Sequence, residues 1–516
     1  MNRRAFPQTP TPAGAATRIG APNLSGFTGT IVGSIVVVIV ASAALTAYSV
    51  GVLPVFNDRT GQLEPLVVIT GVLWILFALS LVLLRRVPPR AVVALVLFGS
   101  LAIGTAALAG PPNTSTDSAR YAWDGIVQNA GISPYRYVPA DPALTALRPE
   151  WLFPAAVDGQ CPPPPIHPFT EPGTASTGTA STGTARTGTD QSAATLCTAI
   201  NRPTVPTIYP PTSELYFAAV RLIAADTAGY WPLQVAGLVV SVGITMILLL
   251  ALRRRGLDPR WAALWGWSPL AATEAVTNSH VDVLGGLLVL VATLLITADK
   301  PWRGGIALGA AIAVKLIPVI AAPALLRRHP VAVIVGSILS FALLYVPYVL
   351  STGVKVIGYL PGYLSEEGYD NGSRFILLSL FLPGTASLVV AALLIALTAF
   401  LVWLKCRDPW LGLLIMIGVT LLIVTPRYPW YALLLLPIVA MTGRWEWLTV
   451  PLALTSRFLV PSLLLGRLAA IAAIVTVLWL TWKRLSPDVR ARLKRRFGAI
   501  TRMAPRTRNF WPNING

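Results

Sequence analysis

The sequence predicts an all-α, polytopic membrane protein. Of its 516 residues, 54% are hydrophobic and only 12% are charged, whereas a soluble globular chain has about 25% charged residues. A membrane-spanning helix needs about 20 apolar residues. Runs near that length lie at 29–52, 65–84, 91–110, 231–252, 281–298, 330–349 and 384–404. Runs that are shorter or contain a polar residue lie at 261–277, 410–424, 430–442, 447–463 and 467–483. Together they predict a bundle of about 12 to 14 transmembrane helices.

The distribution of charge predicts how the chain crosses the membrane. Its net charge of +19 would suggest a nucleic-acid partner in a soluble protein. Here the basic residues, such as Arg253–Arg255 and Arg327–Arg328, fall between apolar runs in alternation, which is typical of cytoplasmic connections. Residues 111–212 instead hold five arginines and seven acidic residues, a net charge of −2. We therefore predict no nucleic-acid partner and an extracytoplasmic location for this loop.

This topology divides the chain into five regions. They are a cytoplasmic tail at 1–28, three transmembrane helices at 29–110, an extracytoplasmic loop at 111–230, a transmembrane core at 231–483 and a basic cytoplasmic tail at 484–516 that binds anionic lipid. Residues 214–228 are predicted to form an amphipathic helix on the outer interface. Residues 304–326 contain Pro318 and Pro323 and are predicted to form a re-entrant hairpin. A single span there is the alternative and would invert the topology downstream.

The cysteines predict one disulfide. Cys161 and Cys197 fall in the extracytoplasmic loop, whereas Cys406 falls in a cytoplasmic turn. The bridge would close the loop around a Gly/Thr/Ala/Ser repeat at 173–188, which is too poor in apolar residues to fold alone. The alternative is a flexible insert with two unpaired thiols. The repeat is also compatible with a glycosylated or wall-contacting tether.

Asp124 is the predicted catalytic residue. It lies in Trp123-Asp124-Gly125, just after an apolar run, with Arg120 and Tyr121 one turn earlier. Charged groups at a membrane edge are costly and usually functional. A carboxylate there can take the proton of an acceptor hydroxyl as a general base, which contributes about 10²- to 10⁴-fold in rate.

Further polar residues recur in or beside the apolar segments that reach the same side. We predict that they bind substrate: Arg120, Tyr121, Trp123, Tyr209 and Glu214 from the loop, Glu274, Asn278, His280 and Asp282 from one turn, and Tyr428 and Trp430 from another. Prolines at 201–211 rule out regular structure for most of that stretch. Glu274, Asn278 and Asp282 share one face if their helix is continuous. Helix-end capping and a metal site remain alternatives for the turn, although its spacing matches no ligand motif.

Lys315, Arg374 and Arg427 are the predicted ligands of a donor phosphate. An internal salt bridge from Lys315 to Asp282 or Glu274 is the alternative for that residue. The sequence contains neither a phosphate-binding P-loop nor a dinucleotide-binding motif. One acid, several cations and aromatic residues at a membrane surface therefore indicate transfer from a phosphate-activated lipid.

These segments resemble the C superfamily of membrane glycosyltransferases (GT-C), and more narrowly the polyprenol-phosphate-mannose-dependent mannosyltransferases of glycosyltransferase family 87 and their actinobacterial relatives. The likeness covers about residues 90–440. It rests on Arg-Tyr-Ala-Trp-Asp-Gly at 120–125, Gly-Ile-Ser-Pro-Tyr-Arg-Tyr at 131–137, the proline-rich stretch at 201–211, Asn-Ser-His-Val-Asp at 278–282, Ala-Val-Lys-Leu-Ile-Pro at 313–318 and Tyr-Pro-Trp-Tyr at 428–431.

The resemblance implies a GT-C-like bundle in a bacterial plasma membrane. It implies inverting transfer on the outer face, with Asp124 as base, a polyprenyl-phosphate sugar as donor and a cell-envelope glycolipid or glycan as acceptor. Mannose is the common donor sugar, and arabinofuranose is used by relatives. No cofactor is required, and a divalent cation is possible without a supporting motif. The chain departs from the family in placing the acidic loop after its third predicted helix rather than its first.

Two other functions fit parts of the sequence. A transporter also combines many helices, buried charges and a broken helix, but the sequence shows no internal repeat and carries a hundred-residue loop rooted at an acid. A non-catalytic scaffold for envelope assembly is the second alternative.

Overall fold

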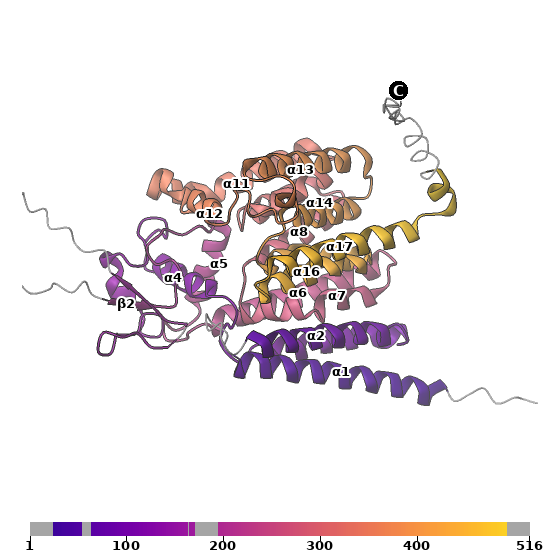
Figure 1. The fold of residues 1–516 in the computed structure, drawn as a ribbon, viewed down its shortest axis with the longest axis horizontal. Helices are drawn as coiled ribbons and strands as arrows, with labels where there is room; N and C mark the ends of the chain where they lie inside the picture. The colour runs from indigo at the N-terminus through magenta and orange to yellow at the C-terminus, as the bar shows by residue number, and fades with distance from the viewer. Residues whose placement is uncertain (1–23, 54–62, 164, 171–194, 493–516) are drawn as a thin grey trace, which may run out of the picture.

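The computed structural model describes residues 24–53, 63–163, 165–170 and 195–492. Arg186, the repeat at 173–188, most of the predicted N-terminal tail and residues 493–516 lie outside the described residues. The described chain forms a long helical bundle with a smaller head at one end (Figure 1). We use head for the described part of residues 111–229.

Long apolar helices build the bundle. Within the described residues, seven segments are long and apolar enough to cross a membrane. They contain α1 (Leu24–Val52), α2 (Leu63–Leu84), α3 (Pro89–Ala106), α6 (Trp231–Arg254), α11 (Pro330–Thr352), α13 (Thr385–Lys405) and α17 (Leu463–Arg484). An eighth is η3 (Ala271–Thr277) together with α8 (Asp282–Thr297), which are bent by 111°. The polytopic all-α class is confirmed, and the total of 12 to 14 spans stays a prediction.

Shorter elements complete the core. They are η2 (Pro259–Ala262), α7 (Ala263–Gly266), η5 (Gly353–Ile357), α12 (Leu360–Glu366), η6 (Leu378–Leu380), α14 (Pro409–Val424), η7 (Pro429–Leu434), α15 (Leu436–Thr442), η8 (Trp445–Leu448) and α16 (Thr449–Leu459).

The segment predicted as a re-entrant hairpin begins and ends at the same level of the bundle. Its first arm, α9 (Pro301–Ile312), runs parallel to α11, since Gly305 lies against Val333 and Gly309 against Ser337. The chain between them must therefore turn back, through η4 (Ile317–Ala321) and α10 (Ala322–Leu325). His329 Nε2 lies 3.0 Å from Asp299 Oδ1, which joins the two ends of the hairpin.

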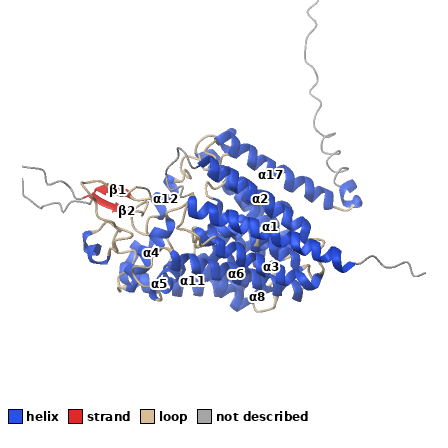
Figure 2. Ribbon diagram, turned by 90° about the horizontal axis from the view of Figure 1, so that it is seen from below, coloured by secondary structure: helices blue, strands red, loops and turns tan. Residues whose placement is uncertain are grey.

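The head combines two helices with a small hairpin. It contains α4 (Asp117–Asn129), η1 (Pro142–Leu147), α5 (Pro211–Leu222) and the antiparallel strands β1 (His167–Thr170) and β2 (Thr195–Thr198), which lie at the far end of the head in Figure 2. Cys161 and Cys197 form a disulfide, with their Cα atoms 5.5 Å apart. The bridge fixes the chain before β1 to β2 and thus holds the ends of the insert together.

The basic connections meet at the end of the bundle opposite the head, where α1 begins and α17 ends (Figure 1). Arg260 donates to the carbonyl of Leu84 at 3.0 Å. Arg327 donates to the carbonyls of Leu404 and Cys406, both at 3.1 Å. The alternation of charge along the sequence predicts this arrangement, with the basic connections at one end and the nearly neutral head at the other.

Candidate active site

A cavity of about 680 Å³ lies between the head and the bundle. Segments far apart in the sequence form its walls: the start of α4, the proline-rich loop, the tip of the hairpin, α12 and the chain from Arg427 onward. Its polar and aromatic lining consists of Asp117, Arg120, Arg202, Tyr209, Lys315, Tyr359, Tyr363, Tyr369, Arg427, Tyr428, Trp430 and Tyr431. Parts of several predicted segments thus meet at one site, although the turn at 274–282 supplies none of the lining residues.

Asp117 is the one carboxylate among the described residues of the lining. It is the first residue of α4, and its side chain is 20% exposed. Burial raises the pKa of Asp117 above its ordinary value, and the positive charges of Lys315 and Arg202 lower it in part. The carboxylate is therefore reachable from the cavity and more basic than one in water.

Asp124 does not line the cavity. It lies two helical turns after Asp117, which is about 10 Å along the axis of α4, and is 2% exposed. Arg120 Nε lies 2.9 and 3.0 Å from its two carboxylate oxygens. The carboxylate predicted as the base is thus enclosed in an ion pair inside the head.

Glu214 shares this enclosed site with Asp124. It is fully buried, and its Oε1 accepts a hydrogen bond from Thr207 Oγ1 at 2.8 Å. Burial raises the pKa of Glu214 well above its ordinary value, and the negative charge of Asp124 raises it further. Burial also raises the pKa of Asp124, against the lowering effect of Arg120. These effects favour the protonated form of Glu214, whereas Arg120 favours the ionised form of Asp124.

The other residues around Asp124 pack the head. Trp123 is 1% exposed and lies edge-on to Phe153, with ring centroids 4.8 Å apart. A Cβ on Gly125 would lie 2.6 Å from the carbonyl oxygen of Phe217, so only glycine permits this approach of α4 to α5. Tyr121 is fully buried and stacks on Phe217 at 4.4 Å. Tyr121 and Trp123, expected to bind substrate, do not line the cavity.

The turn with Glu274, Asn278 and Asp282 is not a continuous helix, so the condition under which these residues would share one face is not met. The chain bends by 111° between η3 and α8, and Ser279 takes a left-handed φ of 56°. Asn278 Oδ1 accepts hydrogen bonds from the backbone N–H groups of Asn113 and Thr114, both at 3.2 Å. Asn278 therefore ties the turn to the chain that leads into α4 and lies outside the cavity lining.

His280 lies behind the cavity wall at this turn. It is fully buried and stacks on Trp430, with ring centroids 3.8 Å apart and an angle of 20° between the planes. Its Nδ1 lies 3.7 Å from Asp117 Oδ2, and its Nε2 lies 3.2 Å from Glu274 Oε2. The Tyr121 hydroxyl lies closer to Nδ1, at 3.5 Å, and His280 is not among the lining residues of the cavity. No three His, Cys, Asp or Glu side chains gather into a metal site within the described residues.

Lys315 lies at the tip of the hairpin and reaches the cavity. The start of α5 holds this tip: the N–H of Thr212 donates to Ala313 O at 2.9 Å, and Ser213 Oγ donates to Val314 O at 2.6 Å. Lys315 Nζ lies 2.9 Å from Asp282 Oδ2 and 4.5 Å from the centre of the Tyr431 ring. The salt bridge to Asp282, which was the alternative to phosphate binding, is present, and the lysine also lines the cavity.

The arginines predicted to bind phosphate occupy different surroundings. Arg427 lines the cavity, is exposed and forms no ion pair with any described residue. Arg374 is 3% exposed, pairs with Glu367 and lies outside the lining, behind Tyr369 and Tyr431. Arg202 lines the cavity, and its Nη2 lies 2.7 Å from Glu366 Oε2. Arg427 is thus the cation most free to take an anion.

Several residues of the lining were not among the predicted site residues: Asp117, Arg202, Tyr359, Tyr363, Tyr369 and Tyr431. Asp117 and Asp124 are seven residues apart and share one face of α4, so their order along the chain does not say which reaches the cavity. A sequence signal for Asp117 existed in its place at the helix start, directly after the third apolar run.

Residues 207–437 match the model of glycosyltransferase family 87. This part of the chain, a little less than half of its length, is similar to that family. The match supports a membrane glycosyltransferase, which is what the resemblance to family 87 implied. The match covers the hairpin tip, the turn with His280 and the chain around Arg427, and it begins after α4. No curated protein and no solved structure matches the chain.

Proposed function

We propose that the chain is a family 87 glycosyltransferase and that it transfers a sugar, most simply mannose, from a polyprenyl-phosphate sugar to a glycolipid or glycan acceptor of the bacterial cell envelope. The observation that carries the proposal is the cavity itself. It combines one carboxylate, Asp117, with the cations Arg202, Lys315 and Arg427 and with many aromatic rings. An acid, phosphate-binding cations and ring platforms are what transfer from a phosphate-activated sugar needs.

Asp117 replaces Asp124 as the proposed general base. An acceptor hydroxyl becomes a good nucleophile when a carboxylate takes its proton as the new bond forms. Asp117 is the carboxylate that reaches the cavity, and its raised pKa makes it a stronger base. In the proposed inverting transfer the acceptor attacks the sugar carbon opposite the leaving phosphate, so the anomeric configuration inverts.

The cations hold the donor phosphate in this proposal. Arg427 is free of ion pairs among the described residues, so its guanidinium offers paired N–H donors to phosphate oxygens. Lys315 adds a second positive charge, which stabilises the negative charge that develops as the phosphate leaves. Apolar residues of the lining, including Leu66, Leu316, Leu364 and Phe458, contact the start of the lipid chain.

The distribution of charge supports a cavity on the outer face. The basic connections meet at the end of the bundle opposite the head, and basic connections favour the cytoplasm. The cavity then opens toward the outside, where envelope glycans are extended. Both chain ends lie on the cytoplasmic side in this orientation.

A transfer assay tests the proposal. The full chain in lipid nanodiscs is given radiolabelled polyprenyl-phosphate-mannose and octyl mannoside as acceptor. We expect labelled disaccharide product whose new linkage has the anomeric configuration opposite to that of the donor. A polyprenyl-phosphate-arabinofuranose donor in parallel tests the alternative sugar. In sealed vesicles, movement of label across the membrane without a new glycosidic bond would instead identify a transporter.

A further inference from the structure

The large cavity has apolar lining on two sides, and only one of these sides is open. Leu316, beside the hairpin tip, and Leu364 of α12 line the cavity and are 37% and 40% exposed. On the other side, Leu66 of α2 and Leu459 of α16 are only 4% and 8% exposed. Apolar side chains that line a cavity and are also exposed mark a surface on which a lipid chain can lie. The side between the hairpin tip and α12 is therefore the one that lipid can reach.

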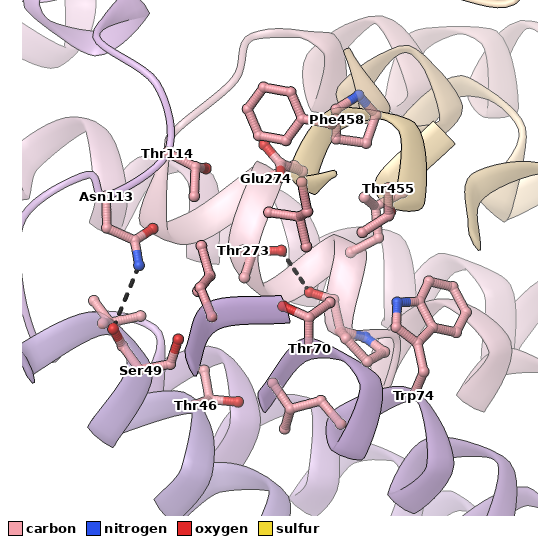
Figure 3. A pocket seen from close by; sticks show the side chains of 17 residues that line it. Thr46, Ser49, Thr70, Trp74, Asn113, Thr114, Thr273, Glu274, Thr455 and Phe458 are labelled. Atoms are coloured by element: carbon pink, nitrogen blue, oxygen red, sulfur yellow. Dashed lines mark hydrogen bonds between the residues drawn. The ribbon is translucent and has the colours of Figure 1, made fainter. Parts of the chain in front are cut away.

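A second cavity, of about 30 Å³, lies behind the closed side, among α1, α2, η3 and α16. Figure 3 shows polar side chains around it, with Thr46 and Ser49 on one side and Glu274 on the other. A polar cavity needs about 10–15 Å³ to hold one water molecule, so this one is too small and too polar for a prenyl chain. The residues that line both cavities and separate them are Leu66, Thr114, Phe458 and Leu459. A lipid-linked donor therefore does not enter past α1 and α2.

Residues 353–366 cover the open side, and we call them the lid. They comprise η5 and α12 and begin where the membrane-spanning helix α11 ends. All fourteen are described, and none of them is buried. Four of them nevertheless line the cavity: Tyr359, Leu360, Tyr363 and Leu364. Segments with few buried side chains open at a low cost in free energy, so the lid can move while the bundle stays folded.

The lid is anchored at one end and can turn at the other. Directly after it, Glu367 pairs with the buried Arg374. At its start, Gly353 has φ of 60° and ψ of −135°, a conformation that is almost restricted to glycine. Backbone rotation at a few such positions can move the segment between them as a unit. The geometry thus allows the lid to pivot about Glu367.

Polar contacts hold the lid against the head. The N–H of Tyr359 donates to the carbonyl of Thr207 at 3.2 Å. Glu366 accepts a hydrogen bond from the Tyr359 hydroxyl and lies 2.7 Å from Arg202 Nη2. Glu366 therefore joins the start of α12 to the proline-rich loop. Its pair with Arg202 is partly exposed, and water screens such a pair, so it can part and form again.

Gly358 fits closely against the head at this contact. A Cβ there would run into the carbonyl oxygen of Thr207. Gly384 lies outside the lid and has nearly the same backbone conformation, with φ of 61° and ψ of −143° against 60° and −144° at Gly358. A Cβ on Gly384 would meet no described atom within 4 Å. The two glycines therefore separate the effect of backbone strain from the effect of losing the contact with the head.

Resting on the proposed donor, we propose that the lid opens toward the outer leaflet to admit the polyprenyl-phosphate sugar and closes over it, with the contact between Arg202 and Glu366 as its latch. The prenyl chain then lies between Leu316 and Leu364, and the phosphate reaches Arg427. A closed lid keeps water away from the sugar carbon.

A loosened lid admits water, which can replace the acceptor. The water oxygen then bonds to the sugar carbon, the bond from that carbon to the phosphate oxygen breaks with its electron pair, and a water proton goes to Asp117. The products are free sugar and polyprenyl phosphate. The ratio of free sugar to transfer product therefore reports how well the lid closes.

This ratio is measured with the full chain in nanodiscs, labelled polyprenyl-phosphate-mannose and octyl mannoside. Glu366→Gln weakens the latch and should raise the ratio about two- to fivefold, since a partly exposed ion pair is weak. Gly358→Ala pushes the lid off the backbone of Thr207 and should raise it about tenfold or more. The controls are Gly384→Ala and Glu150→Gln, which removes an exposed acid of the head that pairs with no described residue. Both should keep the native ratio.

Spin-label distances follow the lid without any sugar chemistry. The labels are placed on Ala146→Cys in the head and Ser365→Cys in α12, both at exposed positions, with the free Cys406 replaced by serine. We expect donor to shorten and narrow the distance distribution of the native chain. Gly358→Ala should keep the distribution long and broad with or without donor.

Several outcomes would overturn the lid. An unchanged ratio in Glu366→Gln does so even if Gly358→Ala fails to fold, and an equal rise in Gly384→Ala would assign the effect to backbone strain. Equal label distances in the native chain with and without donor would also overturn it. If the native chain transfers no sugar, the proposed function falls, while the label distances in the native chain and Gly358→Ala still decide whether the segment moves. Transfer by the native chain with unchanged ratios in the variants overturns the lid alone.

Discussion

Replacing Asp117 by asparagine separates the two acids of α4. The amide side chain has nearly the same volume as the carboxylate but cannot act as a base. Because Asp117 is the one carboxylate that the described residues contribute to the cavity lining, no second side chain there can take over as the base. We expect kcat to fall by about 10²- to 10⁴-fold, which corresponds to about 2.7–5.4 kcal/mol in the activation barrier.

The matched change, Asp124→Asn, should affect stability instead. It leaves Arg120 without the carboxylate that lies 2.9 Å away in a nearly closed site. Breaking a buried ion pair on one side costs about 3–5 kcal/mol. Glu214 is close enough to ionise in place of Asp124, so we expect the loss to lie at or below the lower end of this range. The kcat of the folded fraction should remain within a few-fold of the native value.

The measurement is steady-state sugar transfer in nanodiscs, with thermal unfolding and donor binding followed on the same samples. Asp117→Asn should bind donor and unfold like the native chain while transferring little sugar. Our reasoning would be refuted by an Asp117→Asn variant that keeps its kcat. It would equally be refuted by an Asp124→Asn variant that is fully folded and inactive, since that result returns the base to Asp124.

Three further changes probe the phosphate site, the buried acid pair and the disulfide. Arg427→Ala should raise the donor KM roughly ten- to a hundredfold, because a charge-assisted hydrogen bond contributes about 1.5–3 kcal/mol. Arg136→Ala, which removes an exposed arginine, serves as the control. Equal donor KM values for Arg427→Ala and the native chain would exclude a contact between Arg427 and the donor phosphate. The pKa of Glu214 is raised in the folded chain. Above pH 4.5, the ordinary pKa of glutamate, the unfolded chain therefore loses a proton from Glu214 that the folded chain keeps. The free energy of unfolding should then fall by up to about 1.4 kcal/mol per pH unit as the pH rises toward the pKa of the folded state. Glu214→Gln should flatten this slope in thermal unfolding between pH 5 and 8, and parallel curves would contradict the assignment. Replacing Cys161 and Cys197 by serine opens a bridge across 36 residues and should cost about 3–4 kcal/mol, measured by the unfolding of the head, whereas Cys406→Ser should leave it unchanged.

Local signals predicted much of the fold correctly. Apolar runs of sufficient length gave the main spans, since a helix in lipid must satisfy its backbone within one segment. Pro318 and Pro323, flanked by basic residues, indicated the hairpin. In the structure the chain turns back near Lys315, so that His329 at the end of the hairpin contacts Asp299 at its start. The pairing of Cys161 with Cys197 followed from their shared loop.

The site was predicted less well, for a physical reason. Trp123-Asp124-Gly125 stood out because an acid between an aromatic residue and a glycine is unusual, but that pattern records the packing of α4 against α5. The turn at 274–282 has helical spacing, yet the left-handed Ser279 breaks it and sends Glu274 and Asp282 to different partners. Neither the packing of α4 against α5 nor the break at Ser279 leaves a periodic signal in the sequence.

By itself, then, the sequence determined an all-α membrane protein and its likeness to family 87 and indicated a disulfide and a broken hairpin, because composition, length and spacing along one chain carry this information. Only the tertiary structure decided which acid faces the substrate. Asp117 and Asp124 lie on the same face of the same helix, and they differ only in what packs against them. Arg120, Glu214 and α5 enclose Asp124, while Asp117 opens onto a cavity whose other walls come mainly from residues 201–210, 315–317, 359–369 and 427–461.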